Sequence, residues 1–462
     1  MSNPVPDPSP ETLRAWDRDH LWHPFTPQAD WAAADPLVID RGEGVYLFDV
    51  HGRRFLDGVG SLWCNVHGHR HPALDAALRE QIDRVAHTTL LGATHAPAVE
   101  LARRLVERAP AGLTRVFFSD DGATAVEVAL KMAFQYWRQK PDPEPRRTRF
   151  LALGDAYHGD TLGDVSIGGV NRFHAMFAPL LFPALRAPSP NCYRCPLGLE
   201  RPSCATACLG EVERLLAEHP GEVAAVVAEP LVQGAAGMIV HPEGYLKGLR
   251  DLTRAHNTLL IADEVAVGFG RTGTLFACEQ ESVTPDFLCL AKGITGGYLP
   301  LAATLTTEAV YSAFYGTARD GLTFYHGHTY GGNPLGAAVG LASLRVFDEE
   351  RTLDNLRPKV ARLAGRLAEF GRLRHVGDVR QRGLMAGIEL VSERAGKTPF
   401  DPADQIGARV CLKARDFGLL IRPLGDVLVV MPPLAISAEQ LDWMVDVMIR
   451  CTRIITEGAE PV

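Results

Sequence analysis

The sequence predicts an α/β protein with a large, mostly parallel sheet and a smaller α+β part. From about residue 70 to 340, short apolar runs alternate with segments of helical periodicity, which is typical of a parallel sheet. After about residue 345, one long helical pattern is followed by paired strand-like runs. We therefore expect an N-terminal arm with part of a small domain over 1–70, a large domain over 71–344, and a C-terminal small domain over 345–462.

The individual elements follow from local patterns. The first ~20 residues are proline-rich and predict a loose arm. Residues 45–60 alternate apolar and polar side chains around Gly52, which predicts a hairpin that could complete the small domain. The predicted strands of the large sheet are 115–118, 150–153, 223–228, 259–262 and 287–290. The small domain is predicted to have a helix around 360–367 and strands within 376–390 and 421–433.

Composition and charge exclude several classes of protein. Of the 462 residues, 46% are hydrophobic and 22% are charged, as in ordinary globular proteins. The net charge is −8 and no basic block stands out, so we expect no nucleic-acid partner. Apolar runs such as 223–228 are too short to span a bilayer, and the N-terminus has no apolar core typical of a leader. We expect a cytoplasmic protein that acts on small molecules and has no contact with membranes.

Four of the nine cysteines lie together in one stretch with the spacing C-x2-C-x8-C-x3-C. They are Cys192, Cys195, Cys204 and Cys208. Four thiolates in so short a segment are candidate ligands for a structural zinc ion or an iron–sulfur cluster. The alternative is a surface loop of reduced thiols, or an occasional disulfide.

Asp263 and Lys292 each follow a predicted strand of the large sheet. Ligands bind beyond the carboxyl ends of parallel strands, so both side chains are expected in one crevice. Burial lowers the pKa of a lysine amine and makes it a nucleophile for carbonyls. Pyridoxal phosphate needs this pair: a lysine for the Schiff base and an acid that keeps the pyridine nitrogen protonated. Taken singly, the favoured interpretations are a surface lysine and a helix-capping aspartate.

A phosphate cradle is predicted at Gly122 and Ala123, which precede an amphipathic helical pattern. The free N–H groups and the dipole of a helix start attract phosphate. Thr124 and Glu127 have the spacing of a capping box, and the Asp121 side chain is expected to point away from the phosphate as a cap.

Two more strand ends carry candidate side chains. Tyr157 follows the strand at 150–153 and could lie over a flat cofactor ring. Glu229 ends the strand at 223–228 and is expected to pair with Arg271 or Arg422. For Tyr157, an ordinary turn is the alternative.

At this point the residues resemble a known family. DEVAVGFGRTG at 263–273, followed by AKGITGGYLPLAATLTT at 291–307, is similar to the signature of the class III aminotransferases. The resemblance implies a fold-type I pyridoxal-phosphate transferase that works as a homodimer with shared active sites. Further motifs cover nearly the whole chain and resemble the biotin-pathway branch, which aminates 8-amino-7-oxononanoate to 7,8-diaminononanoate. They are HLWHPFTPQADW, GSLWCNVHGHRHPALD, DAYHGDTLGDVSIGG, HGHTYGGNPLG and IRPLGD.

The resemblance implies a role for each matching position. Lys292 would form the Schiff base and act as general base, and Asp263 would pair with the pyridine nitrogen. At the cofactor phosphate, the resemblance implies Gly122, Ala123 and, from the partner subunit, Thr329. Tyr157, oriented by Asp160, would cover one face of the ring, with Val265 and Ala266 on the other side. Arg422 would bind the substrate carboxylate, and the substrate channel would be lined by Phe25, Trp63 and Tyr157.

Departures from the better-known members leave the amino donor open. Phe25 stands where they have tyrosine, Leu62-Trp63 where they often have two tryptophans, and Asp121-Gly122-Ala123 where they have Ser-Gly-Ser. The pattern of Phe25, Leu62-Trp63 and the Gly-Tyr-Leu-Pro segment at 297–300 is similar to the branch that uses lysine instead of S-adenosylmethionine. An aromatic face favours a cation, so losing an indole should change how a sulfonium is held.

Three other functions compete with this one. The cysteine insert resembles one in other class III aminotransferases, which favours a donor such as an ω-amino acid or a polyamine. A decarboxylase or an aminomutase would use the same lysine and aspartate. A non-catalytic, cofactor-binding regulator is disfavoured because no helix-turn-helix or basic patch is present.

Overall fold

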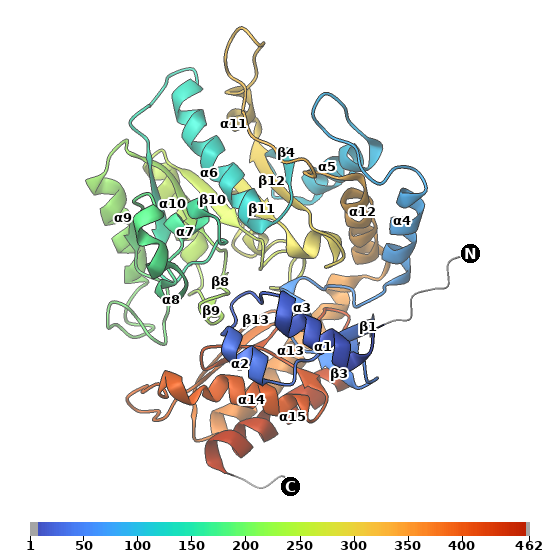
Figure 1. Cartoon of the computed structure of the whole chain (residues 1–462). Coiled ribbons are helices and arrows are strands. Elements are labelled where there is room, and N and C mark those ends of the chain that lie inside the picture. The colour runs from blue at the N-terminus through green and yellow to red at the C-terminus, as the bar shows by residue number, and fades with distance from the viewer. Residues whose placement is uncertain (1–7, 459–462) are drawn as a thin grey trace.

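A seven-stranded sheet organises the upper part of the molecule in the computed structural model, which describes residues 8–458 (Figure 1). Its strand order is β4-β12-β11-β10-β7-β5-β6, and β12 runs antiparallel to both of its neighbours. The bounds are β4 Leu113–Ser119, β5 Arg149–Leu153, β6 Leu185–Ala187, β7 Val223–Ala228, β10 Leu259–Asp263, β11 Phe287–Leu290 and β12 Ala302–Thr307. The five predicted strands are confirmed, and so is the α/β class.

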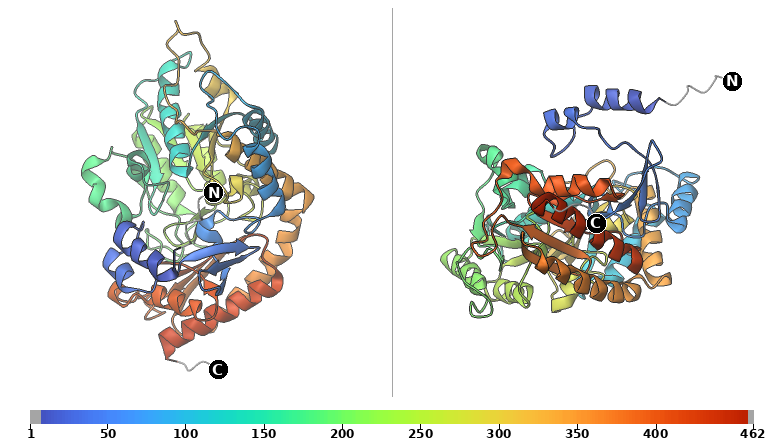
Figure 2. Two further views of the ribbon diagram at one scale, coloured as in Figure 1. Left: turned by 45° about the vertical axis from the view of Figure 1, so that its right-hand side comes forward. Right: turned by 90° about the horizontal axis from the view of Figure 1, so that it is seen from below.

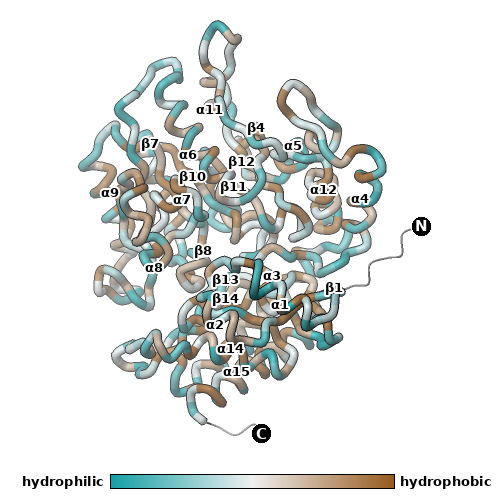
Figure 3. The backbone as a smooth tube through the Cα atoms, in the orientation of Figure 1, coloured by the Kyte–Doolittle hydropathy of each residue, from teal (hydrophilic) through white to brown (hydrophobic). Residues whose placement is uncertain are grey.

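Helices bury both faces of this sheet, which explains why its strands are continuous apolar runs. Ile261 packs with the buried stripe of α6 on one face, whereas the adjacent Leu260 and Ala262 belong to the core on the other. The covering helices are α5 Ala96–Arg108, α6 Gly122–Gln139, α9 Ala207–Glu218, α10 Tyr245–Ala255 and α12 Pro334–Glu349. In Figure 3, brown apolar stretches run through the interior around α6, β10 and β11.

The C-terminal segment builds a second sheet with the order β13-β14-β17-β16. Its bounds are β13 Val376–Arg382, β14 Met385–Leu390, β16 Pro423–Leu424 and β17 Val427–Val430, with α13 Thr352–Leu367, α14 Ile406–Arg415 and α15 Ala438–Glu457. These elements confirm the predicted helix and strands of this region. The domain boundaries at 70 and 344 stay a prediction.

The predicted hairpin is confirmed as β2 (Tyr46–Asp49) and β3 (Arg54–Asp57). β1 (Ile39–Glu43) pairs with β2, and β3 pairs in parallel with β15 (Leu419–Leu420). The N-terminal hairpin therefore joins the C-terminal part of the chain, in the lower half of Figure 1.

The expected loose arm is wrong over residues 10–20, because they form helix α1 (Pro10–His20). The Ser9 hydroxyl caps it by accepting the N–H of Thr12 at 3.2 Å. Neither α1 nor α2 (Gln28–Ala33) has a buried residue, and both stand off the body in the right-hand view of Figure 2. Residues 1–7 of the predicted arm lie outside the described residues.

Short elements complete the chain. They are α3 Gly60–Trp63, α4 Pro72–Ile82, α7 Leu162–Ile167, α8 Asn171–His174, α11 Glu308–Ser312, β8 Val232–Gln233, β9 Ile239–Val240, and the 3₁₀ helices η1 Ala175–Leu180, η2 Ala277–Glu281, η3 Lys292–Thr295, η4 Ala368–Arg372 and η5 Pro402–Asp404. Within residues 8–458, no helix has the length and apolar character needed to cross a membrane. The cytoplasmic location stays a prediction.

Candidate active site

A cavity of about 700 Å³ lies where the carboxyl ends of the central strands converge. Asp263 ends β10, Lys292 follows β11 and Glu229 follows β7, and all three line it. The other predicted site residues on its wall are Trp63, Gly122, Ala123, Tyr157, Asp160, Val265 and Ala266. The predicted convergence of strand-end residues is therefore observed.

Lys292 stands at the first position of η3 with a left-handed backbone (φ 44°). Such a conformation costs about 1–3 kcal/mol outside glycine and is found mainly at functional sites. Its Nζ lies 5.5 Å from the centre of the Trp63 ring. Burial lowers the pKa of the amine, and the nearby carboxylates of Asp263 and Glu229 oppose that shift only in part. The amine is therefore more readily neutral than a surface lysine.

Asp263 is held by two contacts at the end of β10. Its Oδ2 lies 2.7 Å from Nδ1 of His158, and its Oδ1 accepts the N–H of Val265 at 3.0 Å. Asp263 and His158 are both buried, and Nε2 of His158 has no partner among residues 8–458. Sequence reasoning missed His158, although it follows Tyr157 at the end of β5. The contact with His158 fixes the orientation of the Asp263 carboxylate at the cavity wall.

Glu229 takes a different role from the predicted one. Its carboxylate accepts the N–H of Tyr157 at 3.1 Å and that of Gly234 at 2.9 Å, and burial raises its pKa to about 7. The expected pairing with Arg271 or Arg422 is wrong. Arg271 is buried and donates to the carbonyls of Asn65 (2.6 Å) and Pro432 (2.5 Å), and Arg422 is exposed. Backbone groups therefore take the place of the expected ion pair, although Nε of Arg271 has no hydrogen-bond partner among residues 8–458.

The predicted cradle at Gly122 begins helix α6, whose cap is the expected one but whose capping box is not. The Asp121 carboxylate accepts the N–H of Thr124 at 2.9 Å, which confirms Asp121 as the cap. The capping box joins Asp121 and Thr124, so the predicted box of Thr124 and Glu127 is wrong. Glu127 instead accepts from the Thr161 hydroxyl at 2.6 Å and the Gly163 N–H at 2.9 Å.

Gly122 has no room for a side chain, and this leads to a prediction. A Cβ there would collide with Cγ1 of Val265 and lie 3.0 Å from its Cγ2. Gly122→Ala should push Val265 into the cavity and weaken pyridoxal phosphate binding by about tenfold, a loss of about 1.4 kcal/mol. Absorbance titration of the purified protein with the cofactor measures the dissociation constant.

Gly210→Ala is the matched control, because Gly210 lies in helix α9 with open space around it. That change should stabilise the helix slightly and leave the dissociation constant unchanged. Unaltered cofactor binding by Gly122→Ala would contradict a cradle at this helix start.

Tyr157 forms part of the cavity wall and connects it to the N-terminal arm. Its hydroxyl donates to Oδ2 of Asp160 at 2.8 Å, as expected. Its ring centre lies 6.1 Å from that of Phe173, which lies 5.4 Å from that of Phe25. Phe25 is 59% exposed and reaches the site only through Phe173, a residue that sequence reasoning missed.

Two further predicted site residues, like Phe25, lie away from the cavity. Arg422 is exposed between β15 and β16, and Thr329 is exposed in the loop that follows α11. Neither belongs to the lining. A single chain therefore brings together the predicted cofactor-binding residues other than Thr329.

The four clustered cysteines are free and half-buried, and they line a pocket of about 20 Å³. Burial raises the pKa of the Cys192 thiol, and it raises that of Cys208 to about 11. Among residues 8–458, no three histidine, cysteine or acidic side chains are arranged to hold a metal ion. The metal-site interpretation of the insert has no support.

The cavity fits pyridoxal phosphate on three observations. A helix start without a side chain offers N–H groups to a phosphate at Gly122. A buried carboxylate, Asp263, can face a cationic ring nitrogen, and Lys292 supplies an amine whose pKa is lowered. These are the groups that the cofactor requires from a protein.

Known proteins match this chain over almost its whole length. The family model described as "Aminotransferase class-III" matches residues 28–452. An adenosylmethionine-8-amino-7-oxononanoate aminotransferase of Nitratidesulfovibrio vulgaris is 59% identical over 97% of this chain and 83% of its own length. The crystal structure of a protein of that name from Methanocaldococcus jannaschii is 41% identical, covers 96% of this chain and 99% of the other, and has a TM-score of 0.92.

An amine transaminase from an uncultivated Pseudomonas species, solved in its PLP-bound form, is also similar. It is 39% identical, covers 95% of this chain and 99% of its own, and has a TM-score of 0.89. This chain belongs to the class III aminotransferases and is a pyridoxal-phosphate-dependent enzyme of fold type I.

Proposed function

We propose that this enzyme transfers an amino group to 8-amino-7-oxononanoate and forms 7,8-diaminononanoate in biotin biosynthesis, with S-adenosylmethionine or lysine as donor. The observation that carries the proposal is the match over 97% of the chain to a relative named for this reaction, together with a cavity that holds the amine and the acid needed for transamination. The donor is left open by the residues that depart from the better-known members, Phe25 and Leu62.

Lys292 and Asp263 would carry the chemistry. Pyridoxal phosphate supplies, when bound, a carbonyl that accepts the amino group and a ring that takes up the electron pair released at carbon. The neutral Lys292 amine would hold the cofactor and then remove the α-proton of the donor as general base. Asp263, backed by His158, would keep the ring nitrogen protonated.

The remaining wall residues would bind and orient. The N–H groups at Gly122 and Ala123 would hold the phosphate, while Tyr157 and Val265 would enclose the ring. Trp63, 8% exposed, would exclude water beside Lys292.

Arg422 would hold the carboxylate of the keto substrate. Its guanidinium has no ion-pair partner among residues 8–458, and it lies outside the cavity. The carboxylate of 8-amino-7-oxononanoate is at the opposite end of the chain from the ketone, so a cation outside the cavity suits it. Phe25 and Phe173 would line the path between the two.

We infer that a second copy of the chain completes the site. Thr329 lies in an exposed loop with large apolar side chains, among them Tyr325 (84% exposed) and Tyr330 (61%). Exposed aromatic groups of this size favour association. In such a homodimer, Thr329 would contact the cofactor phosphate of its partner.

Half-reactions test the proposal. The cofactor-loaded enzyme should absorb at roughly 400–430 nm, and S-adenosylmethionine or lysine should bleach that band. Adding 8-amino-7-oxononanoate should then restore it. If neither donor bleaches the band but a polyamine or an ω-amino acid does, the enzyme is the alternative kind of class III aminotransferase, which the likeness to an amine transaminase favours.

A further inference from the structure

A five-residue turn forms part of the cavity wall and lies between β8 and β9. These two strands pair antiparallel, and residues 234–238 connect them. Ala235 lines the cavity, and a Cβ on Gly234 would lie 3.3 Å from Cζ3 of Trp63. The N–H of Gly234 donates to Glu229. The position of this turn therefore sets the space beside Trp63.

Arg380, on β13 of the C-terminal sheet, holds the other end of the turn. Its Nε donates to the carbonyls of Gly237 at 2.9 Å and Met238 at 3.0 Å, and its Nη2 donates to Gly237 at 2.6 Å. Both turn residues have a left-handed backbone, with φ 118° and 56°. A planar guanidinium has several donors in a fixed geometry, so it can fix two carbonyls at once.

Glu389, on β14, joins Arg380 to a second arginine. Its Oε2 accepts from Nη1 of Arg380 at 2.7 Å, and its Oε1 accepts from Nε of Arg194 at 2.5 Å. Asp378 also accepts from Nη1 of Arg380 at 2.7 Å. Glu389 is only 8% exposed, and a carboxylate so buried is stable when its oxygens are paired.

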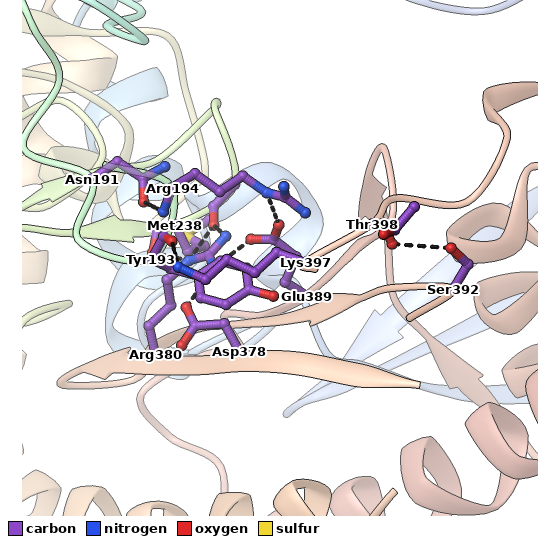
Figure 4. A network of polar contacts seen from close by, with 11 residues as sticks. Asn191, Tyr193, Arg194, Met238, Asp378, Arg380, Glu389, Ser392, Lys397 and Thr398 are labelled. Carbon is purple, nitrogen blue, oxygen red and sulfur yellow. Dashed lines mark hydrogen bonds and ion pairs between the residues drawn. The ribbon is translucent and has the colours of Figure 1, made fainter. Parts of the chain in front are cut away.

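Arg194 belongs to the cysteine insert, between Cys192 and Cys195, and the insert is docked on the C-terminal sheet (Figure 4). Lys397 donates to the carbonyl of Tyr193 at 2.7 Å. The centre of the Tyr193 ring lies 5.0 Å from Nζ of Lys397 and 5.3 Å from Cζ of Arg194. A continuous set of contacts thus runs from the insert through Glu389 and Arg380 to the turn at the cavity.

We propose that Arg380 is a positioning residue that fixes the 234–238 turn against Trp63, and that the cysteine insert supports it through Arg194. The role of this network is to set the width of the substrate path without touching the reacting atoms. The expected effect on substrate binding rests on the proposed function, whereas the expected effect on the position of the 234–238 turn does not.

The test compares the holoenzyme with Arg380→Met, which keeps the stem and removes the donors. Amide hydrogen exchange of the segment 231–241 should become faster, with the cofactor band intact. KM for the keto substrate should rise about tenfold while kcat changes by less than about twofold, because substrate binding rather than the chemical step is disturbed. Arg194→Met should give a smaller rise in KM. The rise in KM of the double variant should fall short of the product of the two single rises, since Arg194 acts on the turn only by way of Glu389 and Arg380.

Arg366→Met is the matched control, because the ion pairs of Arg366 with Asp442 and Asp446 join α13 to α15 away from the turn. It should leave both the amide exchange of 231–241 and the KM unchanged.

If Arg380→Met folds poorly, Arg380→Lys is the second variant. It keeps a charge beside Glu389 but cannot reach both carbonyls, so it should also raise KM. Unchanged exchange and KM in these variants would overturn the proposal. If the wild type accepts no keto acid offered, the proposed function fails and the exchange measurement still decides the role of Arg380.

Discussion

Lys292→Ala should abolish transamination, with kcat lowered by at least about 10⁴-fold, because one side chain both binds the cofactor and moves the substrate proton. The absorbance band at roughly 400–430 nm should be lost as well, since it depends on the lysine amine. The measurements are steady-state turnover and an absorbance scan of the purified variant with added cofactor.

The unfolding temperature distinguishes the loss of the catalytic amine in Lys292→Ala from misfolding of the variant. Burial lowers the pKa of Lys292, so the folded state disfavours the protonated amine that the unfolded chain carries at neutral pH. Removing the amine therefore should not lower the unfolding temperature of the cofactor-free protein. Lys359→Ala is the control: burial also lowers the pKa of Lys359, but its Nζ donates to the Leu434 carbonyl away from the cavity. Full activity in Lys292→Ala would remove this residue from the mechanism.

Asp263→Asn should lower kcat by about 10²- to 10³-fold, the usual loss when a preorganised electrostatic partner is removed from an active site. The amide has nearly the same shape as the carboxylate but no charge, so the ring nitrogen would lose the partner that keeps it protonated. The contact of Oδ2 with His158 would also weaken, because an ionised acceptor makes the stronger hydrogen bond. Turnover and the pH dependence of the cofactor band measure the change.

Asp164→Asn is the matched control for Asp263→Asn. Asp164 is fully buried in α7, and burial beside the carboxylate of Glu127 raises its pKa to about 10. The Asp164 carboxyl is therefore neutral at pH 7 in the folded protein but ionised in the unfolded chain. For this reason the free energy of unfolding decreases as pH rises from about 4 towards 10. The amide removes that cost, and Asp164→Asn should unfold at a higher temperature at pH 7 with activity retained. Equal activity of Asp263→Asn and Asp164→Asn would show that the charge of Asp263 is not needed.

Much of the site was predictable because parallel strands end at the same edge of a sheet. Lys292 and Asp263 follow neighbouring strands, so their meeting required only correct strand assignment. Gly122 was predictable because a glycine precedes a strong helical pattern. The missed strands, β6 and β12, are a three-residue strand and a threonine-rich segment without a clear apolar run.

Predictions of specific polar partners failed more often. Glu229 and Glu127 each have a partner other than the expected one, because backbone N–H groups and a hydroxyl brought close by folding satisfied them first. Local spacing contains no information about such distant donors.

By itself, the sequence determined the order of strands and helices, the continuous apolar runs that bury both faces of the sheet, and the lysine and aspartate at the ends of two strands. These depend on periodicity and on residue type, which are local. Only the tertiary structure decided that His158 holds Asp263, that Phe173 separates Phe25 from Tyr157, and that Arg380 reaches a turn more than a hundred residues earlier. Such contacts are set by packing between distant segments, where each buried polar group takes the partner that folding brings within reach.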